Sequence, residues 1–186
     1  MPEYIIPDVV LLYVKKYILP LKIEVCGYIL FSYNREAMIG EVARGDSKME
    51  RASCVRPYKA NYAWHSHFLN AKSYPSAEDI LSVMKKRETQ KTQNIVEIIF
   101  TRWGIWEISS SEKTVFRNVN AELQYISGKG DDIYRACKGG KTDFYDMGAI
   151  KTFISKVENH YNIIGLRIWF TPWGNDKYVF NTDIKT

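Results

Sequence analysis

The sequence predicts a single α/β (α+β) domain, because strand-like segments alternate along the chain with segments of helical spacing. A length of 186 residues suits one domain. Hydrophobic residues make up 46% of the chain and charged residues 25%, so we expect a sizeable buried core rather than disorder.

Helices are expected where apolar residues recur at helical spacing between a capping residue and a breaker. Asp8 is a candidate N-cap for a first helix, which Pro20 would end. Ser76 would open a second helix, in which Ile80 and Met84 fall on one face. The expected helices span about residues 9–19, 76–87, 115–137 and 147–160.

Strands are expected where β-branched and aromatic residues gather between turn residues. A tight turn at Asn34–Arg35 would join the first two strands as an antiparallel hairpin. Gly27, in the interior of the first strand, indicates a close backbone approach or a bulge. The expected strands span about residues 22–33, 36–43, 58–65, 95–101, 104–109, 163–170 and 178–180.

The charge pattern and the N-terminus bound the class of function. The net charge is +5, yet no stripe of Lys and Arg interleaved with aromatic residues occurs. The basic cluster Lys85–Lys86–Arg87 is therefore expected on a solvated surface, and no nucleic-acid partner is expected. The N-terminus lacks the basic region of a signal peptide, and the apolar stretch at 9–21 is too short to span a membrane.

The three cysteines, Cys26, Cys54 and Cys137, lie far apart in the sequence and form no C-x-x-C pair. Neither a disulfide framework nor a cysteine zinc site is expected from them. A reducing, intracellular setting is favoured.

His65 and His67 stand at the end of an expected strand, in a chain with only three histidines. Side chains two residues apart on a strand share a face, so both imidazoles would point toward one metal ion while Ser66 points away. Asp79 follows in the first turn of the next helix, where the helix dipole favours a carboxylate. Two imidazoles and one carboxylate leave a fourth tetrahedral position for water, which is typical of a catalytic zinc site.

Each part of this group has a simpler interpretation. Ser76-x-x-Asp79 is similar to an N-terminal capping box, which needs no metal. A pair of histidines two apart on a strand is usually exposed or hydrogen-bonded. The convergence of both features across one short loop favours the metal site.

Glu24 is the candidate for the general base that a zinc hydrolase needs beside its water. It stands in the otherwise apolar segment Ile23–Gly27, where a buried carboxylate is costly unless it has a partner or a role. The alternative is a solvent-facing glutamate on an amphipathic strand.

Glu24-x-x-Gly27, His65-Ser66-His67 and Ser76-x-x-Asp79 together resemble the JAMM motif of the JAB/MPN zinc metalloproteases. The resemblance covers about residues 8–110, and its five functional positions occur in the family's order. Two departures concern the loop between the motif's halves. Phe68 stands where the family has proline, and eight residues rather than seven separate the second histidine from the serine.

The resemblance also carries an expected fold. It implies an MPN/cytidine-deaminase-like curved mixed β-sheet flanked by helices. It implies one JAB/MPN-like domain over residues 1–186, with a core at about 8–110 and a C-terminal helical and strand extension at about 111–186. The segments Tyr74–Leu81 and Gly104–Trp106 are similar to JAB-domain proteins encoded by large DNA viruses.

By motif position, the resemblance implies that His65, His67 and Asp79 bind Zn²⁺. Glu24 would be the general base and later the proton donor to the leaving amine, and Ser76 would stabilise the oxyanion. The implied activity is hydrolysis of isopeptide bonds to ubiquitin or a ubiquitin-like modifier.

Partners and location follow from the same resemblance. The implied partners are a modifier conjugate and either a larger protein complex or a second copy of the chain. The implied location is the cytoplasm or nucleus, of the host cell if the protein is viral, with no membrane partner. Two alternative functions remain open: a non-catalytic MPN scaffold, and a zinc hydrolase of a small amide, peptide or sulfur-carrier adduct.

Overall fold

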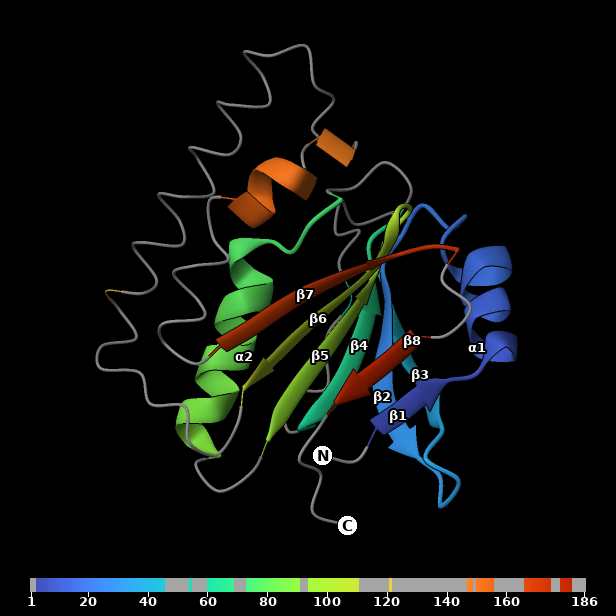
Figure 1. The fold of residues 1–186 in the computed structure, drawn as a ribbon, viewed down its shortest axis with the longest axis horizontal. Helices are drawn as coiled ribbons and strands as arrows, with labels where there is room; N and C mark the ends of the chain where they lie inside the picture. Colours follow the sequence, from blue (N-terminus) through green and yellow to red (C-terminus); the bar gives the residue numbers. More distant parts are fainter. Residues whose placement is uncertain are drawn as a thin grey trace.

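A computed structural model describes the chain at residues 3–45, 54, 60–68, 73–90, 94–110, 121, 147–148, 150–155, 166–174 and 178–181. These residues form a mixed six-stranded sheet, a two-stranded sheet and helices (Figure 1). The α+β class predicted from the sequence is confirmed. Among the described residues, no helix has the length and apolar character that crossing a membrane requires.

The elements follow one another as strands and helices of ordinary length. In chain order they are β1 (Glu3–Ile6), α1 (Asp8–Tyr13), the π-helical turn η1 (Val14–Ile18), β2 (Val25–Phe31), β3 (Ala37–Arg44), β4 (Tyr62–Ser66), α2 (Ala77–Thr89), β5 (Ile95–Phe100), β6 (Gly104–Ser110), β7 (Leu166–Pro172) and β8 (Tyr178–Asn181). Residues 147–148 and 150–155 are also helical.

The large sheet has the strand order β3-β2-β4-β5-β6-β7. All neighbouring strands are antiparallel except β4 and β5, which run parallel. Parallel neighbours need a crossover connection, and α2 supplies it. The strands β4 and β5 are the two central strands of the sheet, and α2 connects them. This connection sets the end of β4 close to the start of α2.

Apolar side chains pack on both faces of the large sheet, because alternate residues of a strand point to opposite faces. On one face, Ile95 and Ile99 of β5 are buried in a cluster with Met84 of α2. On the other face, Ile98 of β5 is buried in a cluster with Val14 of η1. Helix α2 thus covers one face, and the N-terminal helical segment covers the other (Figure 1).

Most of the predicted elements are present, with shifted ends. The strands expected at 22–33, 36–43, 58–65, 95–101, 104–109, 163–170 and 178–180 correspond to β2 to β8, with ends that differ by up to four residues. Strand β1 was not predicted; it has four residues and pairs with β8 in the two-stranded sheet. The helix expected at 115–137 lies, apart from residue 121, outside the described residues.

The first helix begins differently from the prediction. Pro7 is the N-cap of α1, and Asp8 is its first residue rather than its cap. Proline has an extended backbone here and offers no capping side chain, so the predicted cap is wrong. The aspartate still lies in the first turn, where the helix dipole favours a negative charge.

Two further expectations are wrong. Lys85 is exposed, but the side chains of Lys86 and Arg87 are only 1% and 4% exposed, so the basic cluster is not a solvated surface. Cys26 and Cys54 form a disulfide with their Cα atoms 6.2 Å apart. Sequence separation did not reveal that the fold brings these two cysteines together.

Gly27 has the steric role that its place in a strand predicted. A Cβ at this position would overlap the carbonyl oxygen of Gly40 in the neighbouring strand. That oxygen accepts a hydrogen bond of 3.2 Å from Nε1 of Trp64, and the register of β2 against β3 shifts between Cys26 and Gly27. Both the close approach and the bulge are confirmed.

We predict that Gly27→Ala lowers the free energy of unfolding by about 3 kcal/mol, because the added methyl group must displace backbone. Urea unfolding measures this. Gly40→Ala is the matched control, since its Cβ would meet only Leu30 Cδ1 at 3.8 Å and Tyr28 O at 4.0 Å. Equal loss of stability in both variants would contradict the steric role of Gly27.

Glu107 of β6 is a buried carboxyl on the face of the sheet opposite α2, since its partner across the ladder, Ile98, packs there. Burial raises the pKa of Glu107 above its ordinary value of 4.5, against the opposing effects of Arg167 and of a hydrogen bond from Ser109. Below about pH 4.5 the carboxyl is protonated in both folded and unfolded chains. As the pH rises, the unfolded chain ionises first, so stability falls until the folded carboxyl ionises as well.

We predict that Glu107→Gln, which cannot ionise, becomes more stable relative to the unchanged protein as the pH rises from 4.5 to 7. Denaturant unfolding of both proteins across this pH range measures the difference in free energy. A difference that stays constant with pH would show that Glu107 ionises alike in the folded and unfolded chains.

Candidate metal centre

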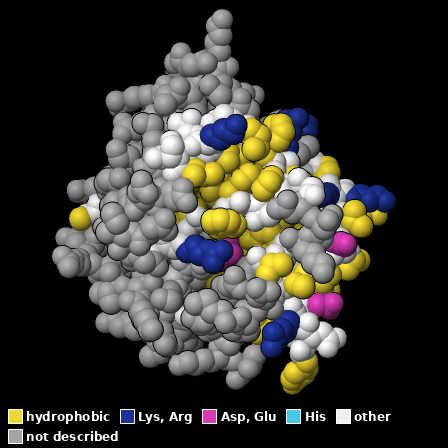
Figure 2. Space-filling model, in the orientation of Figure 1, with side chains coloured by type: hydrophobic (Ala, Val, Ile, Leu, Met, Phe, Trp, Pro, Cys, Tyr) yellow, Lys and Arg dark blue, Asp and Glu magenta, His cyan; other side chains and the backbone are white. Residues whose placement is uncertain are grey.

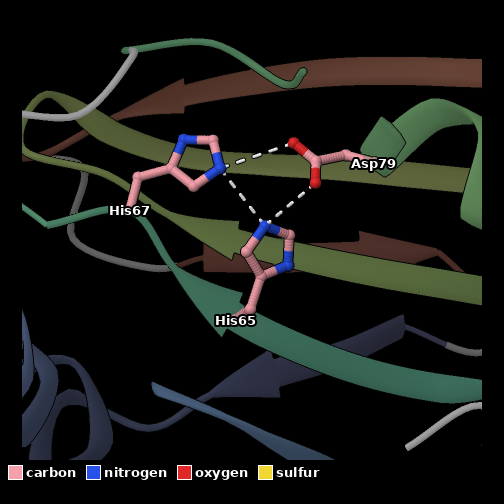
Figure 3. Close-up of side chains that lie close together, drawn as sticks. All are labelled: His65, His67 and Asp79. Atoms are coloured by element: carbon pink, nitrogen blue, oxygen red, sulfur yellow. Dashed lines mark hydrogen bonds and ion pairs between the residues drawn. The ribbon is translucent and has the colours of Figure 1, made fainter. Parts of the chain in front are cut away.

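His65, His67 and Asp79 meet where β4 ends and α2 begins (Figure 3). Nε2 of His65 lies 3.2 Å from Nε2 of His67. The carboxylate of Asp79 lies between them, with Oδ1 3.4 Å from Nε2 of His65 and Oδ2 3.4 Å from Nε2 of His67. The βαβ unit explains the meeting, because it joins the end of a strand to the start of the helix that follows it.

These separations fit a tetrahedral zinc ion. Zinc bonds to imidazole nitrogen and carboxylate oxygen are about 2.0–2.1 Å long, and a tetrahedron with such bonds has edges of about 3.3–3.4 Å. The nitrogen–nitrogen separation of 3.2 Å and the two nitrogen–oxygen separations of 3.4 Å lie close to that value. The three side chains therefore hold their donor atoms at the spacing that one zinc ion requires.

The burial of the group adds a demand for positive charge. His65 and Asp79 are fully buried and His67 is nearly so. On the face drawn in Figure 2, no histidine of the described residues is visible, in agreement with this burial. A buried carboxylate needs a cation or several hydrogen bonds. A metal ion meets this need, and so does a protonated imidazole in an ion pair.

Asp79 is at once a helix cap and a candidate ligand. The backbone N–H of Ser76 donates to Oδ2 of Asp79 at 2.6 Å, and the N–H of Asp79 donates to Oγ of Ser76 at 3.2 Å. The capping box predicted from the sequence is confirmed. Each carboxylate oxygen has two lone pairs, and the cap uses one lone pair of Oδ2. Both lone pairs of Oδ1 and the second of Oδ2 are left to bind a metal. Cap and ligand are compatible interpretations of one residue.

Ser76 is brought to the site by the same capping box. It is half-buried and is the N-cap of α2. Its hydroxyl oxygen accepts from Asp79, which leaves the hydroxyl proton for another acceptor. A hydroxyl donor is therefore present beside the candidate ligand Asp79, at the position where the JAMM resemblance implies one.

Glu24 directly precedes β2 and is half-buried. The register pairs Cys26 with His65; continued two residues along each strand, it sets Glu24 opposite His67. Its Oε2 is buried without a hydrogen-bond partner among the described residues. Oγ of Ser66 accepts from the N–H of Val25 at 3.0 Å, which ties β4 to the residue beside Glu24.

Glu24 lies outside the group of three candidate ligands, whose donor atoms are all within 4.8 Å of one another. A base that acts on a water molecule need not belong to such a group. The orphaned oxygen of Glu24 is an acceptor for a water or a proton in this part of the fold.

Two residues near the site were missed by the sequence reasoning. Oε1 of Glu97 lies 2.9 Å from Nδ1 of His65, and Nζ of Lys86 lies 3.6 Å from Oε2 of Glu97. Glu97 is a lone glutamate in the otherwise apolar strand Ile95–Phe100. A lone glutamate in an apolar segment is also the pattern that indicated Glu24, so the sequence contained a signal for Glu97. With His65 and Asp79, these two residues form a buried polar row between α2 and the large sheet: Asp79, His65, Glu97 and Lys86.

The loop departures from the JAMM pattern are only partly visible. Phe68 is half-buried, and residues 69–72 lie outside the described residues. The effect of the eight-residue loop on the site is therefore still an expectation.

The geometry brings together the three predicted ligands, with Ser76 bonded to one of them and Glu24 on the neighbouring strand end. A comparison of the chain with protein-family models, curated proteins and solved structures found no match. The function must therefore be argued from the chain's own residues.

Proposed function

We propose that the chain is a zinc-dependent hydrolase of the JAMM type, with an MPN fold, that cleaves isopeptide bonds to ubiquitin-like modifiers. The observation that carries the proposal is the triangle of donor atoms at 3.2, 3.4 and 3.4 Å in His65, His67 and Asp79. The order of the motif along the fold supports the JAMM assignment: a glutamate before β2, histidines at the end of β4, and the serine and aspartate at the start of α2.

The number of ligands favours catalysis over a structural role. A structural zinc site is usually closed by four protein ligands, whereas a catalytic site keeps one position for water or substrate. Among the described residues, the group contains three ligands, two of them imidazoles. This composition suits an ion that works as a Lewis acid.

The residues then take defined parts in the hydrolysis. His65, His67 and Asp79 would hold a zinc ion, which would supply a water of lowered pKa and an electrophile for the carbonyl. Glu24 accepts the proton of the attacking water and passes it to the departing amine. The hydroxyl of Ser76 donates a hydrogen bond to the oxyanion that develops on the carbonyl oxygen. These roles use the orphaned oxygen of Glu24 and the remaining hydroxyl proton of Ser76.

We predict that the purified protein binds one zinc ion per chain and that Asp79→Asn abolishes this binding, because the amide lacks the ligand's charge. Equilibrium dialysis followed by metal analysis measures the stoichiometry. Chelation should also lower the melting temperature, since a ligand that binds only the folded state stabilises it.

Glu78→Gln is the matched control for the zinc measurement. Glu78 is exposed in the same first helical turn, so its charge is lost without touching the three donor atoms. Zinc bound equally by Asp79→Asn and the unchanged protein would rule out the proposed metal centre. Ion-pairing within the cluster would then be its better interpretation.

We predict that Glu24→Gln keeps stoichiometric zinc but lowers kcat by about 100- to 10,000-fold, the usual contribution of a general base. Hydrolysis of a panel of diubiquitins and modifier–peptide conjugates measures the rate. The exposed Glu36 serves as the control, and Glu36→Gln should retain full activity.

The same panel separates the alternative functions. Zinc binding without turnover of any conjugate, together with a stable protein partner, would indicate a non-catalytic MPN scaffold. Turnover of small amides or sulfur-carrier adducts alone would keep the chemistry and reject the modifier as the substrate.

A further inference from the structure

We propose that Glu97 is a positioning residue of the metal centre, which holds His65 so that its Nε2 lone pair faces the ion, and that Lys86 holds Glu97 in turn. The inference rests on the proposed zinc site and extends it to two residues outside the motif. Both residues are buried where α2 packs on the large sheet: Glu97 of β5 is 0% exposed and Lys86 of α2 is 1% exposed.

The two ring nitrogens of His65 have different neighbours. Nε2 faces His67 and Asp79 at 3.2 and 3.4 Å, whereas Nδ1 faces Oε1 of Glu97 at 2.9 Å. A neutral imidazole carries one N–H and one lone pair, and a carboxylate accepts only. Glu97 therefore selects the tautomer with the proton on Nδ1, which leaves the Nε2 lone pair directed at the metal position.

Nδ1 of His65 lies within ion-pair distance of Oε1 of Glu97, at 2.9 Å. A carboxylate at this place restrains the rotation of the imidazole about its side-chain bonds, because turning the ring would separate opposite partial charges in a buried region. Carboxylates that accept from a ligating histidine commonly strengthen metal binding in this way.

Lys86 explains how a second carboxylate is tolerated so close to Asp79. Lys86 follows Asp79 by seven residues and Val83 lies between them, so all three project from the buried face of α2. Its Nζ lies 3.6 Å from Oε2 of Glu97 and offsets that charge. A buried ion pair is weak evidence for net stability, because the cost of removing two charges from water offsets their attraction. This argues for a role of Glu97 and Lys86 beyond holding α2 to β5.

The charges of the buried polar row also favour a cation at its end. In their ordinary ionised forms, Asp79 and Glu97 carry two negative charges and Lys86 one positive charge. The row thus keeps one negative charge beside two imidazoles, and a divalent ion at the triangle of donor atoms compensates for it. Without Lys86 the row would have an excess of two negative charges. Without Glu97 the positive charge of Lys86 would be buried near the metal position and would repel the ion.

The test removes both charges of the pair together, because deleting one partner alone would leave a buried uncompensated charge. The double variant Glu97→Gln/Lys86→Met should bind zinc about 10- to 100-fold more weakly, measured by competition with a chromogenic chelator. Glu107→Gln is the matched control: it removes a buried carboxylate from the opposite face of the same sheet and should leave the zinc affinity unchanged.

A second readout needs no zinc. ¹⁵N NMR of the metal-free protein with labelled histidine reports which ring nitrogen of His65 carries the proton. The proposal expects Nδ1–H in the unchanged protein and a mixture of tautomers in the double variant. A purely structural ion pair would not change the tautomer. An Nε2–H tautomer in the unchanged protein overturns the proposal, even if the double variant fails to fold.

The outcomes separate this inference from the proposed function. If the unchanged protein binds zinc and the double variant binds it equally well, the positioning role is rejected and the zinc hydrolase stands. If the unchanged protein binds no zinc, both are rejected. Weaker zinc binding by the double variant but not by Glu107→Gln, together with the change of tautomer, supports the positioning role.

Discussion

The burial of charged and polar side chains between α2 and the large sheet is the constraint on which the rest of the site depends. A carboxylate without water is stable only when neighbouring groups compensate for its charge. Asp79 receives a backbone N–H from Ser76 at 2.6 Å and lies at the positive end of the helix dipole. Both contributions exist only because the chain starts a helix at this point, so the helix start and the chemistry of the site cannot be separated.

The arrangement of strands explains why distant parts of the sequence serve one site. The parallel pair β4 and β5 requires a crossover, and the crossover helix begins where β4 delivers its histidines. Strand β2 pairs with β4 on the other side and brings Glu24 to the same end of the sheet. The place of β2 depends in turn on Gly27, because any side chain there would collide with the carbonyl of Gly40. A steric detail on one face of the sheet thus supports the candidate metal centre on the other.

The sequence predicted what depends on neighbours along the chain and missed what depends on distant pairing. The capping box of Ser76 and Asp79, and the close approach at Gly27, follow from local patterns and are present. The burial of Lys86 of α2, by contrast, depends on the carboxylate of Glu97 on β5. The Cys26–Cys54 disulfide joins residues 28 positions apart, and β1 pairs with β8 from the opposite end of the chain. Periodicity along the sequence carries no information about such distant contacts.

Burial by itself does not mark a functional residue in this fold. Glu97 and Glu107 are both fully buried carboxyls in central strands of one sheet. Glu107 accepts a hydrogen bond from Ser109 and lies near Arg167, and such partners are also typical of a purely structural residue. It lies on the face of the sheet away from the histidines. Glu97 instead faces Nδ1 of His65, and Nε2 of the same ring belongs to the triangle of candidate metal donors. Convergence of donor atoms on one point, rather than the cost of burial, distinguishes the two.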